Sequence, residues 1–298
     1  MRYLRAAAAW LTAGLCAAVL AGCGPSGPSQ TAPAPGRSYY LSLGDSLAQG
    51  VQADPFGHVG PTEHGYADQF YALIRRHYQD LVLVKLGCSG ETTKTMIHGR
   101  HCPYPDGSQL AQAVAFLHHH RGHVPLITID IGANDRRSCF TDPVHATVPH
   151  CATGVAAPTA ANLAQILTRV RAAAGRTTLI IGMNYYAPEL PEWRYGPGGR
   201  LRALVSEQLS VAFDAELTAV YRAFGDPVAD VTGAFATTDF TGRVLVPRIG
   251  LVPVNVANVC RWTWTCARPP RGPNKHPNEA GYRVIARAFL AAYQGARS

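Results

Sequence analysis

The stretch Tyr39-Tyr40-Leu41-Ser42-Leu43-Gly44-Asp45-Ser46-Leu47-Ala48 decides the fold predicted for this chain. Its apolar run, residues 39–43, is too short for a helix and indicates a buried parallel strand. Gly44 permits a tight turn, and Asp45 can hydrogen-bond the backbone of that turn. Ser46 then follows the carboxyl end of the strand, where open α/β sheets bind ligands. Ordinary turn chemistry is the alternative interpretation of the same residues.

Further apolar runs alternate with helical patterns along the rest of the chain. Strands are expected at 81–86, 125–131, 177–183 and 227–231, and helices at 66–78, around 110–117 and 163–170, at 201–224 and at 278–293. This alternation predicts an α/β fold in which a five-stranded parallel sheet carries helices on both faces. Residues 50–65 and 232–275 are expected to be irregular.

The long helix at 201–224 has an apolar residue at every third or fourth position. These residues predict one buried face and are Val205, Leu209, Phe213, Leu217, Val220 and Phe224.

The N-terminus has the pattern of an export signal. Arg2 and Arg5 precede an apolar run of about 15 residues, which is shorter than the ~20 that a spanning helix needs. Small residues before Cys23 resemble the lipobox of bacterial lipoproteins, in which this cysteine is lipidated. We therefore expect a signal peptide at 1–22 and an exported, membrane-anchored envelope lipoprotein; a secreted protein is the alternative.

A Pro-, Ser- and Gly-rich segment, 23–36, follows the predicted cleavage site and indicates a flexible tether. The remaining residues, 37–298, are enough for one domain with a sizeable core.

Six cysteines remain after Cys16 and Cys23, and an even number in an exported chain implies disulfides. Six cysteines allow 15 pairings. We favour the sequential one because each bond then closes a short loop, which stabilises by about 2–3 kcal/mol. The predicted pairs are Cys88–Cys102, Cys139–Cys151 and Cys260–Cys266. Metal binding is disfavoured because no spacing is C-x₂-C.

The net charge of +8 could suggest a nucleic-acid partner. The chain has no clustered Lys/Arg stripe and no nucleic-acid motif, so we expect none. The scattered arginines indicate a soluble surface or attraction to anionic envelopes. We expect a monomer.

Four positions carry candidate chemistry for acyl transfer, which needs a nucleophile, a base and oxyanion donors. Ser46 is the candidate nucleophile and His276 the base that activates it. The backbone N–H groups of Ser46 and Gly90 and the side chain of Asn134 are the candidate oxyanion donors. Taken singly, the glycine and the asparagine are also common turn residues, and the histidine could be an ordinary surface residue.

Two tyrosines follow the strand expected at 177–183. Tyr185 and Tyr186 are candidates for lining an acyl pocket, with burial in the core as the equal alternative.

Four ordered blocks resemble the GDSL-type SGNH hydrolase family: Gly44-Asp45-Ser46-Leu47, Cys88-Ser89-Gly90-Glu91-Thr92-Thr93, Gly132-Ala133-Asn134-Asp135 and His276-Pro277-Asn278. The resemblance implies a flavodoxin-like three-layer α/β/α sandwich and ester hydrolysis without a metal or other cofactor. Cys88-Ser89-Gly90, Tyr185-Tyr186-Ala187-Pro188 and the short-range cysteine pairs resemble most the actinobacterial secreted lipase/esterase branch.

The chain departs from the family at one position. The family usually has Asp three residues before the catalytic histidine, where this chain has Pro273. Some members use a backbone carbonyl there, so we predict that the Pro273 carbonyl accepts a hydrogen bond from Nδ1–H of His276. Asp230 is the less favoured substitute.

The expected activity is hydrolysis of carboxylic esters, with a lipid ester as the favoured substrate. The alternative is a carbohydrate or cell-wall O-acyl esterase. A non-catalytic envelope lipoprotein is disfavoured because Ser46, Gly90, Asn134 and His276 are all present.

Overall fold

The computed structural model describes residues 36–137, 139 and 150–298. The predicted signal peptide at 1–22, the lipidation site Cys23 and nearly all of the predicted tether at 23–36 lie outside the described residues, so these remain predictions. No helix in the described part combines the length and the apolar character needed to cross a bilayer.

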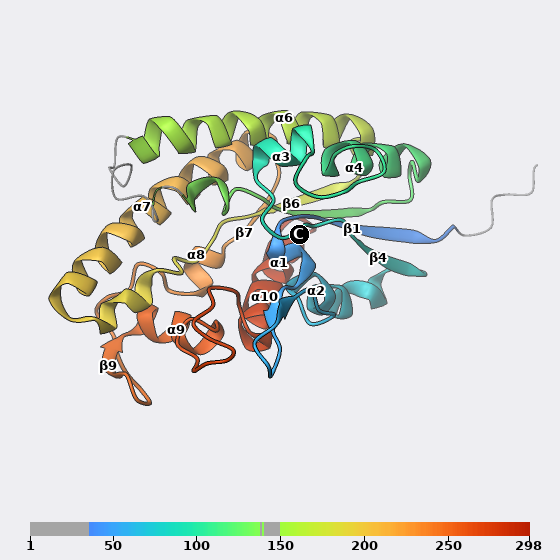
Figure 1. Cartoon of the computed structure of the whole chain (residues 1–298). Coiled ribbons are helices and arrows are strands. Elements are labelled where there is room, and N and C mark those ends of the chain that lie inside the picture. The colour runs from blue at the N-terminus through green and yellow to red at the C-terminus, as the bar shows by residue number, and fades with distance from the viewer. Residues whose placement is uncertain (1–35, 138, 140–149) are drawn as a thin grey trace, which may run out of the picture. The chain divides into compact units, whose positions relative to one another are not determined.

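A five-stranded sheet forms the centre of the molecule, and every neighbouring pair in it is parallel. Its order is β4-β1-β5-β6-β7, so the chain changes direction across the sheet at β1 (Figure 1). Ligands of open α/β sheets bind at this kind of switch point. The predicted fold class is confirmed. The strands are β1 (Ser38–Gly44), β4 (Leu81–Lys85), β5 (Leu126–Asp130), β6 (Leu179–Met183) and β7 (Val228–Ala229).

Helices cover both faces of this sheet, which gives three layers (Figure 1). One layer contains α2 (Tyr66–Ile74) packed against α10 (Glu279–Gly295). The other contains α4 (Gln109–His119), α6 (Ala157–Ala174) and α7 (Gly196–Ala223). The buried strand residues explain this arrangement, because β5 is buried along its whole length and needs apolar cover on both faces.

The segment 232–275 was expected to be irregular, and this expectation is wrong. The segment contains most of α8 (Val231–Ala234), an antiparallel hairpin of β8 (Arg243–Val246) and β9 (Gly250–Pro253), and α9 (Val254–Trp262). Each strand of the hairpin has four residues, and only one side of it is buried. Such short elements give little periodicity in the sequence.

Other short elements were also missed. Two-residue strands β2 (Gln52–Ala53) and β3 (Val59–Gly60) lie in the expected loop, and α3 (Thr93–His98) follows β4.

The predicted buried face of α7 is only partly correct. Leu209, Phe213 and Leu217 are buried, but Val205 is 39 % exposed. The first turns of α7 pack on the short helical segment η4 (Leu190–Arg194), and β6 and β7 contact α7 as well. The apolar residues Leu201, Leu204 and Val205 near the start of the helix are exposed on its other side.

All three disulfides join the predicted partners. The Cα atoms lie 6.5 Å apart in Cys88–Cys102, 5.7 Å in Cys139–Cys151 and 4.9 Å in Cys260–Cys266. Each bond closes a local loop outside the central sheet.

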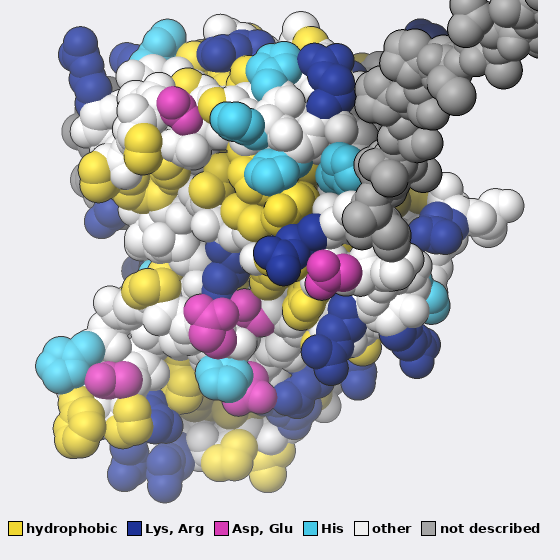
Figure 2. Space-filling view, turned by 90° about the vertical axis from the view of Figure 1, so that its right-hand side faces the viewer, with side chains coloured by type: hydrophobic (Ala, Val, Ile, Leu, Met, Phe, Trp, Pro, Cys, Tyr) yellow, Lys and Arg dark blue, Asp and Glu magenta, His cyan; other side chains and the backbone are white. Residues whose placement is uncertain are grey.

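The charged side chains on one face of the molecule are interspersed. Figure 2 shows Lys and Arg spread over this face with acidic side chains between them, and histidines gathered in its upper part. The histidine run at the end of α4 is mostly exposed, and His118 hydrogen-bonds Arg121. On this face the positive charge is dispersed, as the sequence indicated.

Candidate active site

Ser46 is presented by a turn that its neighbours fix. β1 ends at Gly44, whose φ of 140° favours glycine, and a Cβ there would collide with the backbone of Asp130. The carboxylate of Asp45 then caps the short helix α1 (Ser46–Gln49) by accepting from the N–H of Leu47 at 2.9 Å. Ser46 therefore lies at the carboxyl end of β1, as expected from the sequence, and is also the first residue of α1, which was not expected.

A buried glutamine that the sequence did not single out holds this turn from below. Gln109 accepts from the N–H of Gly44 at 2.7 Å and donates to the Gly44 carbonyl at 2.9 Å. Its side chain is fully buried, and Nε2 also lies 3.0 Å from the Tyr104 hydroxyl and 3.2 Å from Glu91, so its two hydrogens are shared among three acceptors. The backbone N–H and C=O of Gly44 therefore both have hydrogen-bond partners within the protein. A glutamine within a helical pattern carries no sequence signal for this role.

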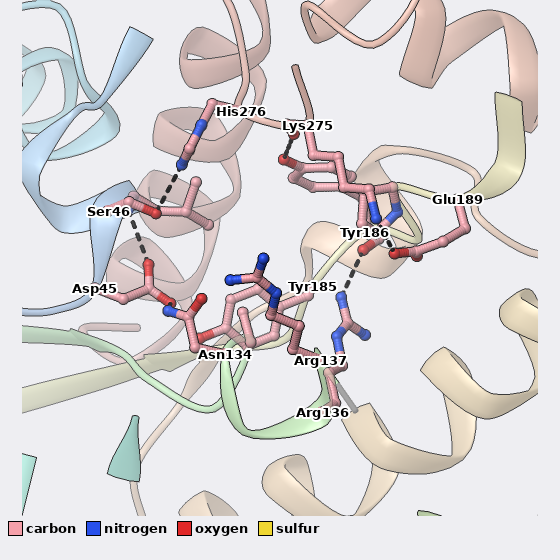
Figure 3. A pocket seen from close by; sticks show the side chains of 13 residues that line it. Asp45, Ser46, Asn134, Arg136, Arg137, Tyr185, Tyr186, Glu189, Lys275 and His276 are labelled. Atoms are coloured by element: carbon pink, nitrogen blue, oxygen red, sulfur yellow. Dashed lines mark hydrogen bonds and ion pairs between the residues drawn. The ribbon is translucent and has the colours of Figure 1, made fainter. Parts of the chain in front are cut away.

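His276 lies within hydrogen-bond distance of Ser46, although 230 residues separate them. The distance from Nε2 of His276 to Oγ of Ser46 is 3.0 Å (Figure 3). The sequence placed both residues in one site, and the tertiary structure brings them together. A base at this distance can take the proton of a serine hydroxyl.

The predicted partner of the His276 ring is wrong. Nδ1 lies 2.8 Å from Oδ1 of Asn274, so the side chain of Asn274 and not the Pro273 carbonyl faces the imidazole. The same Oδ1 accepts from the backbone N–H of His276 at 2.8 Å. Because that backbone group can only donate, the amide oxygen must face the ring, and Nδ1 carries the hydrogen. Nε2 is then the unprotonated nitrogen that faces Ser46.

The local chemistry of asparagine explains the correction. An Asn side chain readily folds back onto the backbone N–H two residues later, which also places its oxygen beside the ring of that residue. Asn-x-His was the available signal. Asp230 does not replace it, because its carboxylate accepts from Asn184 and from the N–H of Gly233, where it caps α8.

Burial sets the protonation of the imidazole. It lowers the pKa of His276 below its ordinary value, since the charged form loses contact with water. The ring is therefore neutral at neutral pH, which is the state that a general base requires.

The loop that carries His276 is tied to the segment after β6. The hydroxyl of Tyr186 donates to the Lys275 carbonyl at 2.7 Å, and Nζ of Lys275 lies 2.9 Å from Glu189 (Figure 3). Tyr186 also stacks on Phe235 with ring centroids 4.5 Å apart. These contacts anchor the loop that carries His276.

Tyr185 and Tyr186 combine both alternatives left open by the sequence. Only 1 % and 5 % of their surfaces are exposed, and both belong to the hydrophobic core. Both also line the cavity beside Ser46. Their rings are core residues whose edges form a wall of the site.

Asn134 and the Gly90 segment lie side by side, as the predicted oxyanion donors require. Asn134 follows β5 and donates through Nδ2 to the Glu91 carbonyl at 2.9 Å and to Asp45 Oδ2 at 3.3 Å. Gly90 has a φ of 85°, and the ring of His101 covers the place where a Cβ would stand. Asn134 lines the cavity, and Gly90 is outside its described lining.

Asp135 fixes the contact between these two segments, a role that the sequence did not indicate. Its carboxylate accepts from the N–H of Thr93 at 2.9 Å and from the Thr93 hydroxyl at 2.6 Å. The loop after β5 is thereby joined to the first turn of α3. The Gly90 and Asn134 segments, which are far apart in sequence, therefore keep one geometry.

Two buried carboxyl groups, Asp45 and Asp130, lie next to the Ser46 turn. Burial raises the pKa of Asp45 to about 6 and raises that of Asp130 well above its ordinary value. Asp130 accepts from the Tyr66 hydroxyl at 2.6 Å. Asp130 is thus held by Tyr66, whereas Asp45 supports the serine turn through the N–H of Leu47.

A cavity of about 340 Å³ opens beside Ser46 and His276. Its walls include the cations Arg136, Arg137 and Lys275 together with Glu189 (Figure 3). This volume is in the range of small-ligand pockets.

In the described part of the chain, one group of side chains has the spacing of metal ligands, namely Cys88, His101 and Cys102. Its two cysteines form a disulfide, so they cannot act as thiolate ligands.

Comparison with known proteins agrees with this geometry. A sequence model of the GDSL-like lipase/acylhydrolase family matches residues 42–284, a range that includes all four blocks. No curated protein matches this sequence.

Several solved structures share the fold. A phospholipase A1 from Streptomyces albidoflavus has a TM-score of 0.55 at 16 % identity, covering 86 % of this chain and 100 % of its own. A lipase from a goat rumen metagenome has a TM-score of 0.54 at 17 % identity, covering 86 % and 97 %. An acetyl xylan esterase variant from Geobacillus stearothermophilus has a TM-score of 0.50 at 17 % identity, covering 86 % and 94 %. At these identities the neighbours establish the fold alone. With its sheet order and the extent of the family match, the chain belongs to the GDSL-like lipase/acylhydrolase family.

Proposed function

We propose that the chain hydrolyses carboxylic esters through an acyl-enzyme on Ser46. The observation that carries this proposal is the 3.0 Å distance between Oγ of Ser46 and Nε2 of His276, with Nδ1 held at 2.8 Å by Asn274. This arrangement has the nucleophile, base and orienting group that acyl transfer uses.

The first half of the reaction forms the acyl-enzyme. Oγ of Ser46 bonds to the ester carbonyl carbon while its proton moves to Nε2 of His276. The carbonyl π electrons move to the oxygen, and the tetrahedral intermediate collapses by breaking the bond to the alcohol. His276 returns the proton to that alcohol as it leaves.

The second half repeats these steps with water. His276 takes a proton from water, whose oxygen attacks the acyl carbon. Collapse releases the carboxylic acid, and the proton on Nε2 returns to Ser46. The neutral imidazole, favoured by burial, starts each half-reaction.

The proposed oxyanion donors are the N–H groups of Ser46 and Gly90 and Nδ2 of Asn134. The bond from Asn134 to Asp45 is long at 3.3 Å, so substrate can compete for this hydrogen. Loss of one such donor typically costs about 10²–10³-fold in rate. Asn134→Ala should therefore lower kcat within that range.

For the substrate, we propose a lipid ester, with a carbohydrate or cell-wall O-acyl ester as the second candidate. The cavity supports the first, because the edges of Tyr185 and Tyr186 give it aromatic walls. A p-nitrophenyl ester series of rising chain length separates the two. A maximum at acetate favours the glycan esterase, and hydrolysis of long chains favours the lipase.

An organophosphonate tests the activity itself. The probe should label Ser46 in the full chain, and Ser46→Ala should remove the label. Ser89→Ala is the matched control because this exposed serine lies in the neighbouring loop. Absence of labelling in the unaltered chain would contradict ester hydrolysis and favour a non-catalytic binding role.

We further propose that the chain is exported, lipidated at Cys23 and anchored to the cell envelope as a monomer. Arg2, Arg5 and the small residues before Cys23 support this. We also place the chain in the actinobacterial secreted branch of its family, on the basis of Cys88-Ser89-Gly90 and the short-range cysteine pairs. Mass spectrometry of the mature N-terminus tests the lipidation.

A further inference from the structure

The first turns of α7 expose an apolar strip. Leu201, Leu204 and Val205 are 64 %, 38 % and 39 % exposed, and the last two follow Leu201 by three and four residues, so they lie on the same side of the helix as Leu201. Tyr195, just before the helix, is 56 % exposed. Exposed leucines are common singly, but a contiguous strip indicates an interaction surface.

The β8–β9 hairpin exposes a second apolar pair. Leu245 and Leu251 are directly opposite each other in the hairpin, which puts them on the same side of it. They are 70 % and 66 % exposed, whereas Val246 and Val252, which follow them, are buried. Buried and exposed apolar residues therefore alternate along the hairpin, and the leucines on its outer side are not covered by any described part of the protein.

These two strips belong to one end of the molecule. Arg243 is on the outer side of the hairpin with Leu245, and its guanidinium lies 5.9 Å from the ring of Trp193. Arg200, in the first turn of α7, lies 5.6 Å from the same ring. Figure 1 places the start of α7 and the hairpin together at its lower left. We call this surface the α7–hairpin face.

Arginines surround the α7–hairpin face and give it a positive charge. They are Arg194, Arg200, Arg202, Arg243 and Arg248. Within the described residues, Arg202 alone among them has an ion-pair partner, Glu192 at 3.1 Å. Exposed leucines, an aromatic ring and arginines are the composition of surfaces that lie in a membrane interface.

We propose that the α7–hairpin face docks on an anionic lipid bilayer. Its leucines and Tyr195 would enter the boundary between headgroups and acyl chains, while the arginines would bind lipid phosphates. A second copy of this chain fits less well, because a two-fold contact would bring arginines against arginines. The contact is peripheral and separate from the proposed lipid on Cys23.

The position of the face agrees with this partner. Pro188 and Glu189 line the cavity, and η4, which carries Trp193, begins at the next residue. The bilayer surface would thus continue from a wall of the proposed active site. Docking itself needs no hydrolysis. The chain could therefore hydrolyse esters without binding a bilayer, or bind a bilayer without hydrolysing esters.

A site-specific fluorescent probe tests the docking without interference from the N-terminal segment. The full chain carries Cys16→Ala and Cys23→Ala, and Leu245→Cys is labelled with an environment-sensitive dye. The vesicles are phosphatidylcholine alone or with one third phosphatidylglycerol. The dye at 245 should shift to the blue with the anionic vesicles, whereas a dye at Leu73→Cys, an exposed residue of α2, should not.

Charge removal gives the quantitative part of the test. Arg243→Gln with Arg248→Gln should weaken the anionic-vesicle titration about 30-fold, since each cation contributes about five- to sixfold. Arg76→Gln with Arg283→Gln is the matched control and should leave it unchanged. Circular dichroism spectra should be the same in all variants, which verifies folding without reference to hydrolysis.

Three results would overturn the proposal: no shift at 245, equal shifts at 245 and 73, or equal shifts with neutral and anionic vesicles. A shift that depends on protein concentration without vesicles would instead identify self-association.

Discussion

Replacing Asn274 with alanine removes the group that orients the proposed base. Oδ1 of Asn274 accepts both from Nδ1–H of His276 and from its backbone N–H, each at 2.8 Å. Alanine keeps the chain length and the loop contacts of Tyr186 with Lys275, so the histidine stays near Ser46 but its ring loses its acceptor.

The size of the effect follows from the charge that develops on the ring. His276 becomes an imidazolium in the transition state, and a hydrogen bond to a charged group contributes about 1.5–3 kcal/mol. Since 1.36 kcal/mol corresponds to tenfold in rate, kcat should fall about 10- to 150-fold. KM should change little, because Asn274 is outside the described cavity lining. His276→Ala should cost far more, roughly 10⁴-fold or above.

Initial rates of p-nitrophenyl ester hydrolysis measure both parameters, and circular dichroism verifies folding. Asp230→Asn is the matched control because this carboxylate caps α8 and should leave kcat within about twofold. Asn274→Asp adds a negative charge beside the ring, which should raise the pKa of His276 and move the acid limb of the rate profile to higher pH. The reasoning is refuted if Asn274→Ala keeps full kcat, or if Asp230→Asn loses as much as His276→Ala.

Three further outcomes are expected. For the unaltered chain, burial lowers the pKa of His276, so the acid limb of kcat/KM should lie below the ordinary histidine pKa of about 6.5, with activity lost as pH falls through it; a pH–rate profile with its limb above 7 would contradict this. In Gln109→Ala the N–H of Gly44 loses its acceptor in the interior, while the Gly44 carbonyl keeps the N–H of Cys88 at 3.1 Å, so the free energy of unfolding should fall by about 1–3 kcal/mol in urea titrations; Gln208→Ala, on the exposed side of α7, should change it by less than about 0.5 kcal/mol. Removing Cys88–Cys102 by double alanine substitution should destabilise by about 3 kcal/mol and removing Cys260–Cys266 by about 2 kcal/mol, because the first bond closes the longer loop; the opposite order in the same titrations would show that loop entropy does not decide.

Local patterns predicted most of the central fold. The run ending at Gly44 and the later apolar runs predicted the parallel strands, because strands buried on both faces must be continuously apolar. The helices between them followed from their periodicity. At Val205 the apolar pattern predicted burial, but the side chain is 39 % exposed. In the β8–β9 hairpin the strands are too short to give a pattern. In both cases burial depends on neighbouring elements that are distant in the sequence.

The candidate site divides in the same way. Ser46 and His276 were identified from their own turns and from a resemblance, and the structure places them in contact. Asn274, Gln109 and Asp135 were not identified, because each acts through a partner whose position depends on the folded chain. Asn274 is the clearest case, since the histidine it orients is only two residues away and the sequence still suggested Pro273.

The sequence by itself determined the order of buried strands and helices, the cysteines available for local loops and the chemical groups at the strand ends. Only the tertiary structure decided which acceptor faces the His276 ring, that Tyr186 holds the His276 loop, and that the starts of α7 and the hairpin share one exposed apolar face. The physical reason is that apolar periodicity and turn preference are local properties, whereas a hydrogen bond or an exposed surface depends on atoms from distant parts of the chain.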